Sequence, residues 1–313
     1  MDKSKVIAAA QVTPVFLDRQ ATVEKACEWI AEAGRNGADL VVFPEAFIPA
    51  YPDWVWSLPA GAQAGLMDEL YVKLVDNSVS IPDSNTDVLC KAAKTSGVHV
   101  IMGLNERNRE ASNSSLYNTI IYIDGDGNLL GKHRKLVPTG GERLVWAPGD
   151  GSTLAAHSTS IGILGGLICW ENYMPLARTA LYAWGTQIYA APTWDYDDPW
   201  QATMQHIAKE GGMFVISACM PLHIDQIPDE LAFKRYYPEG TDWINPGDSV
   251  IVNPRGEIVA GPSHAREEIL YAEVDLDLIT AAKRMLDVTG HYGRPDVFNL
   301  TINRQSNPMI QDG

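Results

Sequence analysis

The chain has 313 residues, of which 46% are hydrophobic and 9% aromatic, and this is enough apolar material for a large folded core. It carries 24 Lys and Arg against 39 Asp and Glu, and the resulting formal charge of −15 argues against nucleic acid or an anionic lipid surface as a partner. The longest apolar run, IGILGGLICW, is about half as long as a membrane-spanning helix, so we expect a soluble, cytoplasmic protein. The four cysteines lack disulfide or metal-ligand spacing, so we expect reduced thiols.

Strand-like and helical patterns alternate in the first third of the chain. Apolar runs bounded by turn residues predict strands, and apolar residues three or four positions apart predict amphipathic helices. The predicted elements are strand 5–13, helix 21–34, strand 39–45, helix 87–97 and strand 99–106. This is a β-α-β-α-β opening, into which a long aromatic segment is inserted after the second strand.

The middle of the chain is rich in predicted strands, and the alternation with helices then resumes. GDG at 125–127 is a strong hairpin signal between strands 117–124 and 128–136. The remaining predicted elements are strands 153–158 and 160–169, a helix ending at Gly185, strand 187–194, helix 200–212, strand 213–220, a hairpin over 248–261, strand 267–277 and a short helix 278–287.

Helices interleaved with strands in both halves predict an α/β fold in which two sheets face each other under outer helix layers. No linker or charge run divides the chain, so we expect one domain over residues 1–290 and a turn-rich tail over 291–313 that lies on the surface or in a subunit contact. A Rossmann fold is the competing interpretation. It is disfavoured because the first strand–helix turn, QVTPVFLD, has no glycine-rich motif for a pyrophosphate.

Cys169 ends an apolar run just ahead of a predicted helix, whose start is marked by Asn172 and Pro175. The partial positive charge at a helix N-terminus favours the thiolate, so Cys169 is a candidate nucleophile. A buried core cysteine is the alternative, and it is the better interpretation for the other three cysteines.

A thiolate nucleophile needs a proton acceptor and a group that stabilises the charge developing on the attacked atom. Glu45 follows a buried strand at its carboxyl end, where the sites of α/β proteins lie, although a solvated loop glutamate is the alternative. The segment KHRKLVPTGGERLVW places Lys135 and Glu142 around a turn, and a solvated charge cluster is the alternative there. None of the seven histidines has a comparable local signal.

Three segments together, FPEAF with Glu45, HRKLVPTGGER with Lys135 and GGLICWENYMPLAR with Cys169, resemble the nitrilase superfamily. These carbon–nitrogen hydrolases are built around a Glu-Lys-Cys triad, and the segments stand in the family's order, 90 and 34 residues apart. The CWEN form, GERLVWAPGDGS, YAAPTWD and GHYGRPDVF resemble the true nitrilase branch. The resemblance implies a four-layer α-β-β-α sandwich of two facing sheets with outer helix layers.

The resemblance also implies a mechanism without a metal or organic cofactor. Glu45 takes the proton of Cys169, whose sulfur attacks a nitrile carbon to give a thioimidate, while Lys135 stabilises the negative charge on nitrogen. Two waters then release ammonia and a carboxylic acid. We expect Glu142 to position Lys135, with an ordinary ion pair to a neighbouring arginine as the alternative. The backbone N–H of Trp170 is expected to help hold the anion.

Aromatic residues follow both the Glu45 strand and the strand beyond Cys169. We expect Tyr51, Trp54 and Trp194, together with Trp170, to bind an aromatic or arylaliphatic nitrile, and Trp56 and Tyr196 lie in the same two loops. Packing in the core or a subunit interface is the alternative for these rings. By resemblance, residues 178–185 and the tail are candidate surfaces of a homo-dimer or higher homo-oligomer.

Three other functions remain open at this stage. An amidase or N-carbamoyl amide hydrolase would use the same triad on amides and ignore nitriles. A nitrile hydratase-like outcome would follow if the thiol, rather than ammonia, left the tetrahedral intermediate. A non-catalytic binding protein on the same fold is the alternative from a different class.

Overall fold

Two six-stranded sheets form the centre of the molecule in the computed structural model, which describes residues 4–308. The first sheet has the order β14 (Glu268–Asp275), β1 (Ser4–Gln11), β2 (Leu40–Val42), β3 (His99–Arg107), β4 (Leu116–Ile123) and β5 (Leu129–Arg134). The second has the order β13 (Ile258–His264), β12 (Gly247–Val252), β9 (Phe214–Ser217), β8 (Ile188–Ala190), β7 (Gly162–Gly166) and β6 (His157–Thr159). A small separate pair consists of β10 (Leu222–His223) and β11 (Trp243–Asn245).

Both six-stranded sheets have three parallel strands at the centre and antiparallel strands outside them. β1, β2 and β3 pair in parallel in the first sheet, as do β7, β8 and β9 in the second. Parallel neighbours need a crossover connection, and helices supply it. The crossover helices are α1 (Arg19–Arg35), α4 (Ser84–Ser96), α5 (Pro175–Ala183) and α6 (Asp198–Gly211). The remaining helices are α2 (Trp54–Ser57), α3 (Ala64–Asp76) and α7 (Leu276–Lys283).

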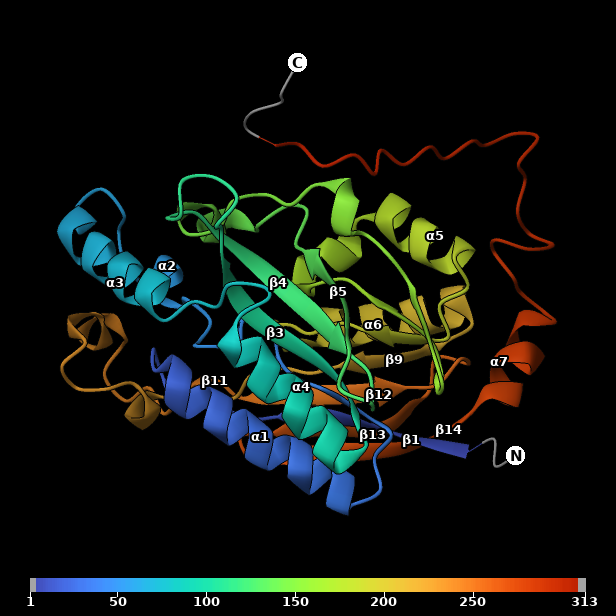
Figure 1. Cartoon of the computed structure of the whole chain (residues 1–313), viewed down its shortest axis with the longest axis horizontal. Helices are drawn as coiled ribbons and strands as arrows, with labels where there is room; N and C mark the ends of the chain where they lie inside the picture. The colour runs from blue at the N-terminus through green and yellow to red at the C-terminus, as the bar shows by residue number, and fades with distance from the viewer. Residues whose placement is uncertain (1–3, 309–313) are drawn as a thin grey trace.

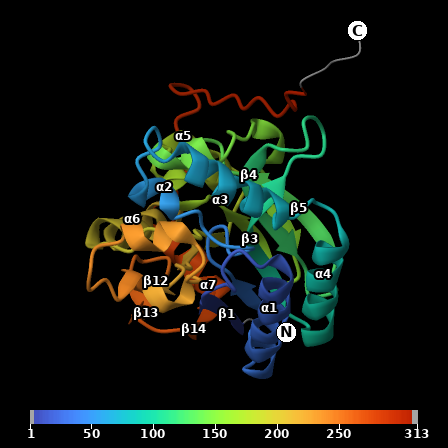
Figure 2. The same cartoon turned by 90° about the vertical axis from the view of Figure 1, so that its left-hand side faces the viewer.

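The helices cover the outer faces of the two sheets (Figures 1 and 2). α1 and α4 pack on the first sheet, where the buried residues of α1 follow helical spacing at Val23, Ala26, Ile30 and Ala33. α5 and α6 pack on the second sheet. The facing sides of the sheets share a core that includes Ile7, Leu40, Ile101, Leu164, Ile188 and Ile216. The predicted four-layer α-β-β-α sandwich is therefore confirmed.

Two parts of the chain differ from what the sequence patterns predict. The aromatic segment after β2 contains α2 and α3, and α3 has a narrow apolar stripe because only Leu70, Leu74 and Val75 are buried. Between β9 and β12 the chain makes an excursion through β10, β11 and two 3-10 turns, Ile224–Gln226 and Ala232–Tyr236. Both insertions lie at the same end of the sandwich, and each supplies residues to the pocket described with the active site, among them Trp56 and Ile244.

The tail lies along the surface of the second half of the molecule (Figure 1). Ile302 packs against the core on the outer face of the second sheet, and the guanidinium of Arg304 lies 5.2 Å from the ring centroid of Trp184. The backbone N–H of Asn307 donates to Asp150 at 2.8 Å. The role of the tail as a surface or subunit contact stays a prediction.

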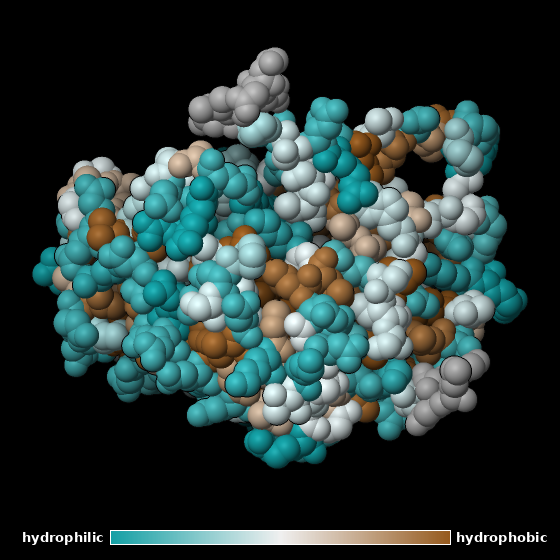
Figure 3. Space-filling model, viewed as in Figure 1, coloured by the Kyte–Doolittle hydropathy of each residue, from teal (hydrophilic) through white to brown (hydrophobic). Residues whose placement is uncertain are grey.

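The molecular face in Figure 3 is mostly hydrophilic, and its hydrophobic groups form separate small patches. Over the described residues 4–308, none of the helices combines the length and the apolar character that crossing a bilayer would require.

Candidate active site

Glu45, Lys135 and Cys169 each follow the carboxyl end of a strand. Glu45 comes three residues after β2, Lys135 directly after β5, and Cys169 three residues after β7 in the facing sheet. Gly103 on β3 permits the bend that carries Glu45, because a Cβ at this position would lie 2.0 Å from the carbonyl oxygen of Pro44. The fold therefore brings three segments that are remote in sequence to one end of the two sheets.

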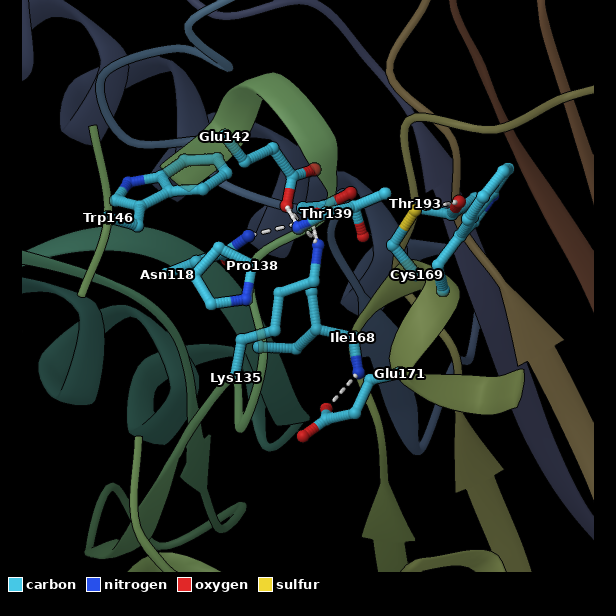
Figure 4. Close-up of polar contacts among 12 residues, drawn as sticks. Asn118, Lys135, Pro138, Thr139, Glu142, Trp146, Ile168, Cys169, Glu171 and Thr193 are labelled. Atoms are coloured by element: carbon cyan, nitrogen blue, oxygen red, sulfur yellow. Dashed lines mark hydrogen bonds and ion pairs between the residues drawn. The ribbon is translucent and has the colours of Figure 1, made fainter. Parts of the chain in front are cut away.

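Lys135 joins two buried carboxylates. Its ammonium lies 2.7 Å from Oε1 of Glu45 and 2.8 Å from Oε2 of Glu142, and all three side chains are at most 2% exposed. Figure 4 shows the Glu142 carboxylate directed toward Lys135. Such a cation is well compensated, because each carboxylate approaches it at the distance of a charge-assisted hydrogen bond.

Further donors fix the two carboxylates in place. Asn118 donates to Oε1 of Glu45 at 2.7 Å, whereas the other oxygen of Glu45, Oε2, is buried and accepts no hydrogen bond from the described residues. The hydroxyl of Tyr51 and the backbone N–H of Thr139 donate to Glu142 at 2.8 and 2.7 Å. Glu45 thus keeps one oxygen free to take a proton, while Glu142 is held on both sides.

The protonation of this cluster is set by burial and by mutual charge. Burial raises the pKa of Glu45 to about 7, although Lys135 opposes the shift and the Glu142 carboxylate adds to it. Burial would lower the pKa of Lys135, but Glu45 and Glu142 more than offset it and hold that pKa well above its usual value. Lys135 is therefore a permanent cation, and Glu45 is a carboxyl group that changes charge near neutral pH.

Cys169 stands on a sharp turn with φ of 50°, a left-handed backbone conformation that side chains rarely adopt. Its N–H donates to the carbonyl of Pro192 at 2.9 Å, and its sulfur accepts a hydrogen bond from the hydroxyl of Thr193 at 3.2 Å. The side chain opens into the pocket described below. The strained turn and the contacts from the 192–193 loop hold the sulfur at a defined point.

The partial positive charge of a helix start, which is expected to favour the Cys169 thiolate, is outweighed in the folded protein. The residues that follow form a 3-10 helix of five residues, Cys169–Tyr173, and α5 begins only at Pro175. Burial raises the pKa of the Cys169 thiol, the Glu45 and Glu142 carboxylates raise it further, and Lys135 only partly opposes them. The resting sulfur is therefore a neutral thiol beside a carboxylate that can take its proton.

Glu171 connects the Cys169 turn to the Lys135 strand, a role that the sequence patterns do not predict. Its buried carboxylate accepts hydrogen bonds from the backbone N–H of Ile168 at 2.9 Å and of Leu136 at 2.8 Å, and it lies 2.9 Å from Nε2 of His133. Figure 4 shows Glu171 reaching back to Ile168. Burial would raise the pKa of Glu171, but His133 and the two N–H groups hold it below its usual value.

A pocket of about 550 Å³ opens above this cluster. Cys169 and Glu142 line it together with aromatic rings, which are those of Tyr51, Trp56, Trp170, Trp194 and Tyr196. Tyr51 and Trp194 stack in parallel with centroids 4.4 Å apart. Trp170 is half exposed, and its indole N–H donates to Asp195 at 2.6 Å. Tyr51, Trp170 and Trp194 therefore line the same pocket as Cys169, and substrate binding by them stays a prediction.

Trp54 does not lie at the wall of the pocket, and this part of the expectation is wrong. It is fully buried and packs edge-on against Phe16 and Phe233 in the core. Trp56, two residues later on the short helix α2, faces the pocket instead and donates from its indole to the hydroxyl of Tyr51 at 3.0 Å. Residues two apart on a helix point in different directions, so only one of the two rings can face the pocket.

Over the described part of the chain, no three His, Cys, Asp or Glu side chains are arranged to share a metal ion.

Residues 6–284 match the family described as carbon-nitrogen hydrolase. The chain is 44% identical over 304 residues to an aliphatic nitrilase of Sinorhizobium fredii, covering 97% of each chain. It is 41% identical over 309 residues to nitrilase 1 of Arabidopsis thaliana, covering 97% of this chain and 88% of the relative. In three dimensions it resembles Nit3 of Saccharomyces cerevisiae, a member of branch 10 of the nitrilase superfamily, with a TM-score of 0.73. The two sequences are 21% identical, and the match covers 92% of this chain and 96% of the Nit3 chain.

Proposed function

The chain belongs to the carbon–nitrogen hydrolase family and to its nitrilase branch, and from this premise we propose that it hydrolyses a nitrile to the carboxylic acid and ammonia. It is a hydrolase of carbon–nitrogen bonds. The observation that supports catalysis by the thiol is the cluster of Lys135 with Glu45 and Glu142 near Cys169, and the choice of nitriles over amides rests on the similar nitrilases. The relatives named above are nitrilases at high coverage, which supports the same activity.

In the proposed first step, Glu45 takes the proton of Cys169 and the sulfur forms a bond to the nitrile carbon. The free oxygen Oε2 is suited to this transfer, since Oε1 already accepts from Lys135 and Asn118. One π bond of the nitrile becomes a lone pair on nitrogen, and the adjacent ammonium of Lys135 stabilises that charge. Glu45 then passes the proton that it took from the sulfur to this nitrogen, which completes a neutral thioimidate and leaves Glu45 ionised again.

The second half of the reaction consumes two waters. Glu45 removes a proton from the first water as it adds to the thioimidate carbon and delivers that proton to the nitrogen. The remaining proton of the added oxygen passes to the nitrogen as the C=O bond forms, so the C–N bond breaks with release of ammonia. The second water adds to the remaining thioester, and the C–S bond breaks to release the acid and regenerate the thiol. Glu142 stays bound to Lys135 throughout and keeps its ammonium pointed at the reacting group.

The substrate that fits this pocket best is an aromatic or arylaliphatic nitrile. Aromatic rings form most of the apolar wall, and a pocket of about 550 Å³ has room for an aryl group and a short linker. Aliphatic nitriles are the competing class, because the relative in Sinorhizobium fredii is an aliphatic nitrilase. Matched pairs such as phenylacetonitrile and hexanenitrile separate the two, and a higher kcat/KM for the alkyl member would overturn the aromatic preference.

A homo-dimer or higher homo-oligomer is part of the proposal. The proposed contact regions are residues 178–185 and the tail. Leu176, two residues before the first region on α5, is 68% exposed, and Phe298 in the tail is 76% exposed, so a large apolar side chain lies beside one region and within the other. Sedimentation analysis of the wild type and of a Leu176→Glu variant tests it. A wild-type chain that sediments as a monomer at micromolar concentration contradicts it.

The deciding experiment follows ammonia release from a panel of nitriles, amides and N-carbamoyl compounds, with intact mass measured in parallel. We expect ammonia and acid from nitriles, and a covalent adduct that is absent in Cys169→Ala. Ammonia from amides alone would identify an amidase instead, amide as the main product would indicate a nitrile hydratase-like outcome, and no turnover of any compound would favour a binding protein.

A further inference from the structure

A buried hydroxyl lies against the sulfur of Cys169. Oγ1 of Thr193 is 3.2 Å from Sγ, and Thr193 has no exposed surface. It belongs to the loop that follows β8, the strand parallel to β7 in the second sheet, so the carboxyl ends of two neighbouring strands bring the pair together. Figure 4 shows Thr193 and the sulfur side by side. Neither the motif spacing nor the aromatic pattern singles this residue out.

The backbone around Thr193 fixes where its hydroxyl lies. The N–H of Thr193 donates to the carbonyl of Ala218 at 2.9 Å, and the N–H of Cys169 donates to the carbonyl of Pro192 at 2.9 Å. These two bonds join the loop to β9 on one side and to the Cys169 turn on the other. The separation of Oγ1 and Sγ is therefore set by main-chain contacts and does not depend on a flexible side chain.

The direction of the hydroxyl proton follows from the other bond that Thr193 makes. The N–H of Asp195 donates to Oγ1 at 2.8 Å, so the oxygen already serves as an acceptor there. A threonine hydroxyl has a single proton to donate. Among the described residues, the sulfur of Cys169 accepts that proton in a hydrogen bond. The hydroxyl is thus oriented as a donor to sulfur before any substrate binds.

Such a donor acts differently on the two forms of the sulfur. A thiol is a weak acceptor, whereas a thiolate carries a full charge, and hydrogen bonds to charged groups are the stronger ones. Burial and the two nearby carboxylates disfavour the thiolate in this pocket, and the Thr193 hydrogen bond opposes them by lowering the pKa of Cys169. The bond therefore becomes stronger at the moment when Glu45 takes the proton.

We propose that Thr193 is a catalytic residue whose hydroxyl stabilises the Cys169 thiolate during attack on the nitrile and again when the sulfur leaves. The proton removed from sulfur passes to Glu45, and Thr193 keeps its own proton throughout. This inference rests on the proposed role of Cys169 as nucleophile. It adds a neutral donor to a site whose charge is otherwise controlled by the Lys135 cation.

The test compares Thr193→Val with Thr193→Ser in the full-length protein. Valine has the shape of threonine without the hydroxyl, and serine keeps the hydroxyl without the methyl group. Alkylation of Cys169 by iodoacetamide is followed between pH 6 and 10 by mass spectrometry of the peptide that carries it. We expect the valine variant to react about ten- to a hundred-fold more slowly at a given pH, with its profile displaced to higher pH, and the serine variant to stay within about three-fold of the wild type.

Turnover supplies the second measurement. With phenylacetonitrile we expect kcat to fall in the valine variant by a similar factor, while KM changes little because the hydroxyl does not line the substrate wall. A merely structural role would lower both variants' folded fraction and leave the pH profile of alkylation in place. The melting temperature of each variant, measured in the same buffer, distinguishes these cases.

Two results would overturn the inference about Thr193. One is a valine variant that alkylates with the wild-type rate and pH profile, and the other is a serine variant as slow as the valine variant. Failure of the proposed function gives a different pattern, because alkylation reads the thiol directly. If no nitrile is turned over but the valine variant still alkylates slowly, the nitrilase proposal fails and the hydrogen bond to sulfur stands.

Discussion

Replacing Glu171 by glutamine removes the charge that holds the Cys169 turn to the Lys135 strand while keeping the side chain's size. The glutamine carbonyl can still accept from one of the two backbone N–H groups of Ile168 and Leu136. The other N–H loses its acceptor, and His133 loses a carboxylate 2.9 Å from its Nε2. Ile168, His133 and Glu171 are buried and Leu136 is partly buried, so water has little access to replace the lost partner.

The expected loss of stability follows from these contacts. One buried N–H without an acceptor costs about 1–3 kcal/mol, and losing the hydrogen bond between His133 and a charged carboxylate costs about 1.5–3 kcal/mol, so the expected loss is about 2.5–6 kcal/mol in all. For a chain of 313 residues such a loss lowers the melting temperature by roughly 5–10 °C. We also expect kcat to fall at least about ten-fold at temperatures where the variant is folded, because small displacements of reacting groups are costly.

Scanning calorimetry and nitrile turnover at a temperature well below the transition measure the two effects separately. Glu110→Gln is the matched control, because Glu110 also lies 3.1 Å from a cation, Arg134, but its side chain is 69% exposed. An exposed pair contributes less than about 1 kcal/mol, so the control should melt with the wild type. If Glu171→Gln also melts within about 2 °C of the wild type and keeps its kcat, the proposed connection between the two segments is wrong.

The remaining predictions concern pH and the pocket wall. The pKa of Glu45 is raised to about 7 and its ionised form is the proposed base, so kcat/KM should rise with pH through about 7. Above that pH it should stay level, because the pKa values of Lys135 and Cys169 are also raised. Glu142→Gln removes a charge that raises the pKa of Glu45, so the midpoint should move to lower pH, and a shift to higher pH would contradict this reasoning. Trp54→Ala should destabilise the fold by about 3–5 kcal/mol in chemical denaturation, because the ring is fully buried. Trp56 is 49% exposed, so Trp56→Ala should instead change the ratio of kcat/KM between bulky and small nitriles about ten-fold with little loss of stability. Equal ratios in the variant and the wild type would show that this ring does not contact the substrate.

The level alkaline side of the expected pH profile follows from the way the carboxylate–lysine cluster is buried in the folded protein. Two interacting carboxylates and a lysine titrate as a coupled group, and the sequence patterns give no burial for any of them. In the folded protein both carboxylates contact the same ammonium, and its pKa rises out of the range in which enzymes are assayed.

The sequence by itself determined the layered α/β architecture and the segments that carry Glu45, Lys135 and Cys169. These features are local: strand and helix periodicity repeats every two or every 3.6 residues, and a hairpin signal such as GDG occupies three positions. The three-segment pattern also identified the family. The short strands β2, β7 and β8 were predicted in place because each is a continuous apolar run between turn residues.

Only the tertiary structure decided which side chains surround the sulfur and what charge each one carries. Glu45 contacts Lys135 although the two are 90 residues apart in the sequence, and Tyr51 contacts Glu142 across 91 residues. No local stretch of sequence therefore contains either pair. Burial depends on packing from all sides, which is why Trp54 lies in the core and Trp56 in the pocket. The contacts of Glu171 and Thr193 were likewise hidden, because both arise where loops from different strands meet at one end of the sandwich.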